Sequence, residues 1–311
     1  MNSDVFAVEA FNVDKTYKGT NKKALNNISL KIKEGEISTL LGRNGAGKTT
    51  FIRICSTQLL PTSGKVTIFG YDVVSSPEII RKKISIVPQE GRPLRALTPW
   101  DHIYNWLKIR GEKSDIASQK TSDVLRRLDL FQVRNTPALN LSGGMKQKIL
   151  VGMALATESR LLFLDEPTIG LDPVSRRQVW SLIKDWKNKG ITIILTTHYM
   201  DEAELLSDSI FILDKGMVIS KGTMNDLRKT IKYRIRIDLH NINKYPLGKM
   251  EEIFYSFGKL INIGANSIRL FAFESNLKEI SELAINNNLS FTVSPITLDD
   301  VFVNLLGKKD I

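Results

Sequence analysis

A glycine-rich run at residues 42–50, Gly-Arg-Asn-Gly-Ala-Gly-Lys-Thr-Thr, constrains this chain more than any other feature. It matches the G-x-x-x-x-G-K-[ST] phosphate-binding pattern. Residues 36–41 before it are apolar and β-branched, as in a buried strand, and residues 50–55 continue with helical spacing. A strand, a glycine loop and a helix in this order turn backbone N–H groups and the positive helix end toward an anion. The run therefore predicts a nucleoside triphosphate site, and in this context a chance glycine-rich turn is the weaker alternative.

Residues 42–50, called the phosphate loop below, supply the first set of expected binding residues. Lys48 should reach the β- and γ-phosphates, and the Thr49 hydroxyl should bind Mg²⁺. The nucleotide-binding residues predicted in the loop are Gly42, Arg43, Asn44, Gly45, Ala46, Gly47, Lys48, Thr49 and Thr50.

The length of 311 residues predicts one large domain and a smaller one. No apolar run in the sequence approaches the ~18 residues that cross a bilayer, so we expect no membrane-spanning segment. The first residues, Met1-Asn-Ser-Asp-Val-Phe, lack the basic start and apolar stretch of a signal peptide. The single cysteine, Cys55, excludes an internal disulfide and suits a reducing cytosol, and we expect it to be a small buried residue.

The formal charge of +11 raises the question of a nucleic-acid partner. Residues 230–311 hold ten Lys and Arg against nine Asp and Glu, so the excess lies in residues 1–229. There the cations are scattered, as in Lys22-Lys23 and Arg126-Arg127, without a basic stripe interleaved with aromatic residues. We therefore expect no nucleic acid and favour a solvated surface near acidic lipid headgroups or the nucleotide.

Apolar periodicity predicts alternating strands and helices in a first domain, residues 1–228. Strands are expected at residues 5–12, 24–33, 64–69, 160–164 and 191–195. Helices are expected at residues 99–109, 119–129, 143–157, 174–188 and 199–206. The alternation indicates an α/β fold with a mostly parallel central sheet. The stretch from about 90 to 157 is mostly helical and is expected to form an inserted helical subdomain.

The pattern changes after Gly222, and residues 229–311 are predicted to form a separate accessory domain. Strands are expected at residues 231–239, 259–264, 267–273 and 289–294, and helices at residues 249–257 and 277–287. This β-α-β-β-α-β order predicts a small, ferredoxin-like α+β domain. A capped helix follows from Thr297. Because these residues carry no catalytic motif, we expect a role in dimerisation, regulation or docking.

Two adjacent carboxylates follow the predicted strand 160–164. A strand of this kind places Asp165 at the carboxyl edge of the sheet, beside the phosphate loop, where it can hold Mg²⁺ through water. Glu166 should then point toward the γ-phosphate and act as general base for the attacking water. The alternative is a helix N-terminus decorated with acids, which Pro167 and Thr168 favour.

The segment Leu141-Ser-Gly-Gly-Met-Lys-Gln147 opens a long predicted helix. Ser142 can cap this helix and leave N–H groups free for an anion, although Ser-Gly-Gly by itself is more often a flexible turn. Together with the phosphate loop and Asp165-Glu166, this segment resembles the ATP-binding subunits of ABC transporters. The resemblance covers residues 5–225 and implies a P-loop NTPase fold of the ABC type, with ATP and Mg²⁺ as cofactors.

The resemblance assigns roles to four further residues. Tyr17 looks like the aromatic residue that stacks on adenine, and Gln89 resembles the glutamine that touches Mg²⁺ and the attacking water. Asp172, in Gly170-Leu-Asp-Pro, lies in the loop through which two subunits sense each other, and His198 resembles the switch histidine at the γ-phosphate. Taken singly, the tyrosine could serve packing, the glutamine a turn and the histidine the surface. Their order and spacing together favour the family roles.

Met145 departs from the pattern, because the commonest form of the family has glutamine there, and its side chain cannot form an amide hydrogen bond to the nucleotide. The phosphate-facing residues Ser142, Gly143 and Gly144 are intact. The Met-Lys-Gln variant resembles the drug- and polymer-exporter branch, as does Leu298-Asp-Asp-Val-Phe302 near the end of the chain.

In the ABC arrangement two subunits complete each active site, and the resemblance implies the same here. Lys48, Thr49, Gln89, Asp165, Glu166 and His198 would hold ATP from one side, and Ser142, Gly143 and Gly144 of a second subunit would close it from the other. That subunit is expected to be a second copy, although a paralogue fits the sequence as well. A separate integral membrane permease is the expected partner, with this chain peripheral on the cytoplasmic side of the cell membrane. Trp100 and Trp106 either pack within the helical insert or carry motion to that permease.

Two other functions fit parts of the sequence. The first is a soluble ABC-type ATPase acting on ribosomes or DNA, but the chain has one copy of each motif and no sustained heptads between Lys48 and Ser142. The second is a nucleotide sensor without catalysis, which the presence of both Glu166 and His198 disfavours. Export is favoured over import by the resemblance alone.

Overall fold

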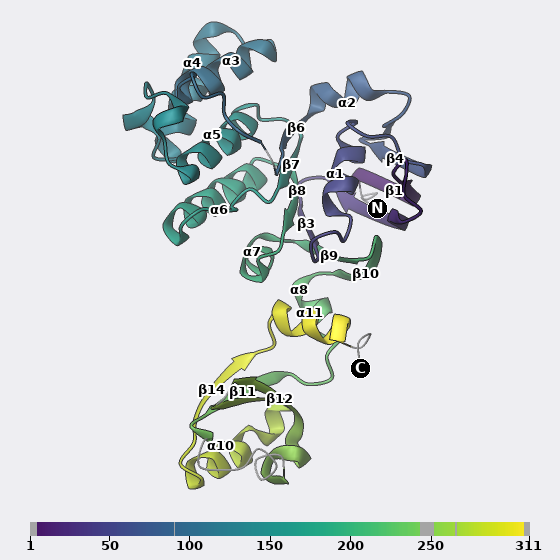
Figure 1. Ribbon diagram of the computed structural model, residues 1–311, viewed down its shortest axis with the longest axis vertical. Coiled ribbons are helices and arrows are strands. Elements are labelled where there is room, and N and C mark those ends of the chain that lie inside the picture. Colours follow the sequence, from purple (N-terminus) through teal and green to yellow (C-terminus); the bar gives the residue numbers. More distant parts are fainter. Residues whose placement is uncertain (1–4, 90, 243–251, 265, 308–311) are drawn as a thin grey trace. The chain divides into compact units, whose positions relative to one another are not determined.

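The structure is a computed structural model that describes residues 5–89, 91–242, 252–264 and 266–307. The chain divides into two compact units, Met1–Thr223 and Met224–Ile311 (Figure 1). The sequence pattern placed the boundary between residues 228 and 229, after α8 (Met224–Arg228). This helix belongs to the second unit because Leu227 is buried there and the Arg228 guanidinium donates a hydrogen bond of 2.7 Å to the Ile296 carbonyl.

The first unit is built around a six-stranded sheet with the order β10-β9-β3-β8-β7-β6. Its strands are β3 (Ile37–Leu41), β6 (Ile84–Val87), β7 (Leu161–Asp165), β8 (Thr192–Thr197), β9 (Ser209–Asp214) and β10 (Met217–Gly222). All neighbouring pairs are parallel except β9 and β10. Every residue of β3, β7 and β8 is buried, which explains their apolar runs. The predicted P-loop α/β fold with a mostly parallel central sheet is confirmed.

Three of the predicted strands do not join this sheet. They form a separate antiparallel sheet of order β2-β1-β4-β5. Its members are β1 (Phe6–Thr16), β2 (Lys23–Lys33), β4 (Ser63–Ile68) and β5 (Tyr71–Asp72). The prediction of one largely parallel sheet was wrong for these strands. Their alternation of apolar and polar residues is typical of an antiparallel sheet with one solvated face.

The two sheets are joined through α1 (Lys48–Cys55), the helix after the phosphate loop. Phe51, Ile52, Ile54 and Cys55 are buried in a core that residues of both sheets share. Burial raises the pKa of the Cys55 thiol, which therefore stays neutral and is a packing residue as expected. The predicted helix at residues 199–206 is present as α7 (Met200–Leu206), whereas α2 (Pro77–Lys83) was not predicted from the sequence.

The helical subdomain lies between β6 and β7 and is visible as a cluster apart from the sheets (Figure 1). Its helices are α3 (Pro99–Ile109), α4 (Ser114–Arg127) and α5 (Gly143–Ala156). α4 begins at Ser114, earlier than the predicted residue 119. Thr98 and Asp101 form a capping box at the start of α3. Residue 90, where the subdomain was expected to begin, lies outside the described residues.

The second unit holds a four-stranded antiparallel sheet of order β12-β13-β11-β14. Its elements are β11 (Ile235–His240), β12 (Gly258–Gly264), β13 (Ser267–Ala272), α10 (Leu277–Asn286), β14 (Ser290–Pro295) and α11 (Leu298–Gly307). In chain order the strands lie second, third, first and fourth, which is the arrangement of a split β-α-β-β-α-β unit. Residues 252–254 are helical, and residues 249–251 of the predicted helix lie outside the described part.

Among the residues that the structure describes, no helix combines the length and the hydropathy that crossing a lipid bilayer requires.

Candidate active site

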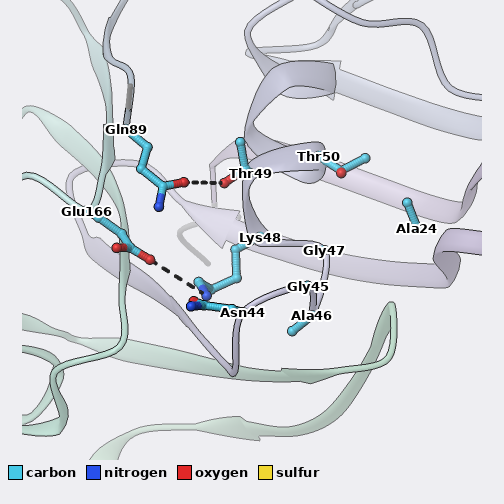
Figure 2. A pocket seen from close by; sticks show the side chains of 10 residues that line it. All are labelled: Ala24, Asn44, Gly45, Ala46, Gly47, Lys48, Thr49, Thr50, Gln89 and Glu166. Atoms are coloured by element: carbon cyan, nitrogen blue, oxygen red, sulfur yellow. Dashed lines mark hydrogen bonds and ion pairs between the residues drawn. The ribbon is translucent and has the colours of Figure 1, made fainter. Parts of the chain in front are cut away.

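The phosphate loop connects the end of β3 to the start of α1 and borders a pocket of about 290 Å³ (Figure 2). The residues that line this pocket are Ala24, Asn44, Gly45, Ala46, Gly47, Lys48, Thr49, Thr50, Gln89 and Glu166. All but Ala24 and the last two come from the loop itself. The structure therefore brings the predicted glutamine and glutamate to the rim of the predicted phosphate site.

Two glycines of the loop are required by their surroundings. Gly47 has a φ of +106°, which L side chains rarely adopt, and a Cβ there would lie 2.7 Å from the Ala24 carbonyl oxygen. A Cβ on Gly42 would lie 2.4 Å from the Leu213 carbonyl oxygen on β9. At both glycines the loop backbone lies so close to a neighbouring carbonyl oxygen that a side chain would not fit.

Lys48 is buried at the base of the pocket and is held by the loop. Its Nζ donates hydrogen bonds to the carbonyl oxygens of Gly42 at 2.8 Å and Arg43 at 3.3 Å. The same Nζ lies 4.0 Å from Glu166 Oε1. Burial lowers the pKa of Lys48, while the charges of Glu166 and Asp165 oppose that shift. The lysine is thus a partly desolvated cation positioned to meet an anion in the pocket.

The two carboxylates lie at the end of β7, next to the parallel strand β8. Asp165 accepts a hydrogen bond from the Thr196 hydroxyl. The Glu166 backbone N–H donates to both the carbonyl oxygen and the hydroxyl of Thr196, each at 3.1 Å. Glu166 has a φ of +52°, in the left-handed region, which is uncommon for this residue type. This turn points the Glu166 carboxylate into the pocket (Figure 2).

Two of the three side chains expected to bind Mg²⁺ meet at the pocket. The Thr49 hydroxyl donates to Gln89 Oε1 at 3.4 Å, so the loop and the segment after β6 meet at this point (Figure 2). Asp165 ends β7, is buried and does not line the pocket. A hydroxyl, an amide oxygen and one carboxylate are ligand types that fit Mg²⁺, which prefers few protein ligands together with water and phosphate oxygens.

His198 follows β8 and contacts the other oxygen of the central glutamate. Its Nδ1 lies 3.2 Å from Glu166 Oε2, and its side chain is 41% exposed. The ring packs against the Tyr199 ring with centroids 4.2 Å apart. Glu166 is therefore flanked by Lys48 on one oxygen and His198 on the other.

Tyr17 lies beside the loop without lining the pocket. Its hydroxyl is 3.2 Å from the Thr50 hydroxyl, and the side chain is 38% exposed. An exposed aromatic ring next to the end of the phosphate loop is in a suitable place to stack on a base.

The structure does not bring the Ser142 segment to the pocket of the same chain. Ser142 caps α5 by accepting a hydrogen bond of 3.2 Å from the Met145 N–H, and Ser142 and Gly143 are exposed. Asp172 caps α6 (Pro173–Asn188) by accepting hydrogen bonds from the Val174 and Ser175 N–H groups, each at 3.0 Å. Hydrogen bonds from Ser175 lower the pKa of Asp172. Both features present their polar groups outward.

Several residues that hold the site together were not indicated as site residues by the sequence pattern. Thr196 forms hydrogen bonds with both Asp165 and Glu166. Gln147 Nε2 donates a hydrogen bond of 3.1 Å to the carbonyl oxygen of Pro167, which directly follows Glu166. Ala24 lines the pocket from β2. The run Leu195-Thr-Thr-His198 contained a signal for Thr196, because polar residues at the end of a buried strand meet those of the neighbouring strand. Ala24 carried no such signal.

Comparison with known proteins identifies the family. The family model described as ABC transporter matches residues 25–169. The doxorubicin resistance ATP-binding protein DrrA of Mycobacterium tuberculosis is 38% identical over 261 residues, which cover 84% of this chain and 78% of that protein. The chain belongs to the ABC transporter family. It is an ATP-binding subunit of the ABC type with ATPase chemistry.

Further relatives in the ABC family cover between 70% and 97% of the chain. The daunorubicin/doxorubicin resistance ATP-binding protein DrrA of Streptomyces peucetius is 31% identical over 307 residues, 97% of this chain and 92% of that protein. A solved ATP-binding subunit of an ABC transporter is 29% identical with a TM-score of 0.67, covering 72% of this chain and 92% of that one. A dimeric ATP-binding cassette in a post-hydrolysis state with ADP and Pi is 28% identical with a TM-score of 0.65, and the match covers 70% of this chain and 98% of that one.

Proposed function

We propose that this ABC subunit hydrolyses ATP to drive export through a separate integral membrane permease, at the cytoplasmic side of the cell membrane. The proposal of export is supported by the two DrrA relatives, whose names describe drug resistance. The observation that carries the catalytic part is the position of Glu166 at the pocket rim, between Lys48 and His198. The transported molecule would contact the permease and not this chain.

The phosphate loop binds the triphosphate in this proposal, and Tyr17 stacks on adenine. Backbone N–H groups of Gly45 to Thr50 and the Lys48 ammonium neutralise the β- and γ-phosphates. The oxygens of Thr49, Gln89 and Asp165 would hold Mg²⁺, which supplies charge neutralisation of the phosphates when it is bound.

Glu166 acts as general base on a water molecule in line with the γ-phosphorus. The water oxygen bonds to phosphorus, the bond to the bridging oxygen breaks, and ADP leaves with that electron pair while Glu166 accepts the proton. His198 holds the Glu166 carboxylate in position through its contact of 3.2 Å. Lys48 stabilises the negative charge of the phosphates from the other side.

A second ATP-binding subunit completes the site. Ser142, Gly143 and Gly144 lie at the start of α5, where exposed N–H groups and the positive helix end suit a phosphate. Because these groups do not line the pocket of their own chain, the proposal assigns them to the γ-phosphate of the facing subunit, with Asp172 at the same interface. Hydrolysis then removes the shared ligand and the subunits separate. The proposal favours a homodimer, and a paralogue in place of the second copy would use the same surfaces.

The Glu166→Gln variant tests the catalytic assignment. We expect it to bind ATP with near wild-type affinity but to hydrolyse it at least about a hundredfold more slowly, because glutamine cannot accept the proton. ATP should therefore hold Glu166→Gln as a stable dimer in size-exclusion chromatography. Glu9→Gln is the matched control, since Glu9 pairs with Lys31 on β2 and lies away from the pocket. Hydrolysis by Glu166→Gln at the wild-type rate would overturn the assignment.

Purification of the protein from gently solubilised membranes distinguishes a transporter subunit from a soluble ATPase that acts on ribosomes or DNA. A multi-spanning protein retained in stoichiometric amount supports the permease assignment. Retention of ribosomes or RNA without such a protein contradicts it.

A further inference from the structure

One fully buried carboxylate in the first unit has no role in the mechanism above. Glu202 lies on α7, four residues after His198, and its side chain is 0% exposed. Carboxylates at such depth are costly unless donors compensate them. The contacts of Glu202 therefore indicate what it stabilises.

Glu202 Oε1 accepts two hydrogen bonds, one from the loop after Glu166 and one from α6. The Thr168 hydroxyl donates at 2.9 Å and the Trp180 indole N–H at 2.8 Å. Thr168 lies two residues after Glu166, in the loop that leads to Asp172, and is itself buried. Trp180 belongs to α6, which lies beside α7 (Figure 1).

The beginning of α7 is attached to the same helix by a second set of contacts. The Arg176 guanidinium lies 4.1 Å over the Tyr199 ring, and that ring packs against His198. Arg176 also lies 3.9 Å from Asp201. The segment from His198 to Glu202 is thus joined to α6 at both ends, and Glu202 additionally joins it to the loop after Glu166.

The electrostatics agree with a carboxylate that is kept in place by its neighbours. Burial raises the pKa of Glu202, and the hydrogen bonds from Trp180 and Thr168 and the charge of Arg176 oppose the shift. In the absence of these donors the carboxylate would have no compensation in its apolar surroundings.

We propose that Glu202 is a positioning residue that couples the loop after Glu166 to the His198 segment, so that the general base and the histidine keep their mutual geometry. The hydrogen bond from Thr168 links Glu202 to the loop after Glu166. The hydrogen bond from Trp180 holds the Glu202 carboxylate against α6. This inference rests on the proposed function of Glu166 and His198. Misplacement of reacting groups by about 1 Å can lower a rate about a hundredfold, so a small loss of coupling is measurable.

Two substitutions that each remove one hydrogen bond from the same oxygen test the proposal. Thr168→Val removes the bond to the loop, and Trp180→Phe removes the bond to α6 while leaving the loop contact intact. We expect Thr168→Val to lower kcat of the full-length chain about tenfold, with KM for ATP unchanged within about twofold. Trp180→Phe should keep kcat within about twofold of wild type. The two variants should have similar thermal midpoints, so that a difference in kcat is not a difference in folding.

A double-mutant cycle and a rescue variant complete the test. Glu202→Met should lower kcat as Thr168→Val does, and the double variant should be no slower than the slower single, because both substitutions remove the same contact between Thr168 and Glu202. Glu202→Gln should restore most of the rate, since its amide oxygen can accept from both donors. Wild-type kcat in Thr168→Val, or equal losses in Thr168→Val and Trp180→Phe, would overturn the coupling. If Glu166→Gln also retained activity, the proposed function itself would have failed.

Discussion

At the scale of single residues, the second unit holds two arginines and two aspartates in one connected network. Arg269 donates to Asp238 at 2.7 Å and to Asp300 at 3.1 Å, and Arg236 donates to Asp300 at 3.2 Å. Asp300 also accepts from the Thr297 N–H and hydroxyl at the start of α11. The motif Leu298–Phe302 noted in the sequence therefore attaches its helix to the face of the sheet that carries both arginines.

Asp238 makes this network sensitive to acid. Burial alone would raise its pKa, but the hydrogen bonds and charge of Arg269 and the charges of Arg236 and His240 lower it below the ordinary value. A carboxyl whose folded pKa is depressed contributes stability above its unfolded pKa, and this contribution disappears as the pH falls through the folded pKa. We expect Asp238→Asn to cost on the order of 1 kcal/mol at pH 7, since the group is partly solvated. The cost should disappear as the pH falls through the lowered folded pKa of Asp238.

Calorimetry measures the difference in stability between wild type and Asp238→Asn. The measurements should run from about pH 2 to about pH 7, so that they bracket the ordinary carboxyl pKa of about 3.9. Asp299→Asn is the control, because Asp299 is exposed on the same helix as Asp300. A stability difference for Asp238→Asn that is independent of pH would contradict the assignment.

At the scale of elements, the turn from the phosphate loop into α1 depends on a backbone conformation that only glycine adopts freely. Gly47 combines a φ of +106° with an approach of 2.7 Å to the Ala24 carbonyl. We expect Gly47→Ala to abolish ATP binding and to lower the free energy of unfolding by more than the ~1 kcal/mol of backbone strain alone. Urea unfolding and nucleotide titration measure the two effects.

The Gly190→Ala variant is the control that separates the cost of a positive φ from the cost of a steric clash at the new Cβ. Gly190 follows α6 with a φ of +82°, and a Cβ there would have no neighbour within 4 Å. Its substitution should therefore cost about 1 kcal/mol and leave ATP binding intact. Equal losses of stability in the two alanine variants would mean that the contact with Ala24 does not matter.

At the scale of the whole molecule, the two halves of the proposed site lie in different places on one chain. The pocket holds the phosphate loop, Gln89 and Glu166, whereas Ser142 and Asp172 cap helices outside it. Two chains each defective in a different half should therefore complement each other. A heterodimer of Lys48→Met and Ser142→Arg retains one intact site, formed by the loop of one chain and the Ser142 segment of the other.

We expect each of these variants alone to be inactive, and an equimolar mixture to recover about a quarter of wild-type ATPase activity, as random pairing in a symmetric dimer requires. Steady-state hydrolysis before and after mixing measures the recovery. Activity in either variant alone would show that its half of the site is dispensable. No recovery in a mixture that still forms dimers would contradict the shared site.

Much of the candidate site could be predicted because its residues stand next to recognisable strand ends. Asp165 and Glu166 follow the predicted strand 160–164, and Glu166 lines the pocket in the structure. Gln89 and His198 were assigned by the family resemblance, and the structure brings Gln89 to the pocket and His198 to Glu166. Glu202 could not be found in this way, since its partners Thr168 and Trp180 are distant in sequence and carry no motif. The four-residue strand β6 was too short to stand out by periodicity.

The sequence by itself determined the chemistry, because a phosphate loop is contiguous and its glycines, lysine and threonine act through local backbone geometry. It also determined the succession of helices and strands in most of both units. The tertiary structure alone decided which strands share a sheet and which distant side chains meet. The strands β1, β2 and β4 belong to an antiparallel sheet and not to the predicted parallel one. Thr196, Gln147 and Glu202 form the contacts that join the segments of the site. Such contacts depend on strand order and burial, which no local pattern contains.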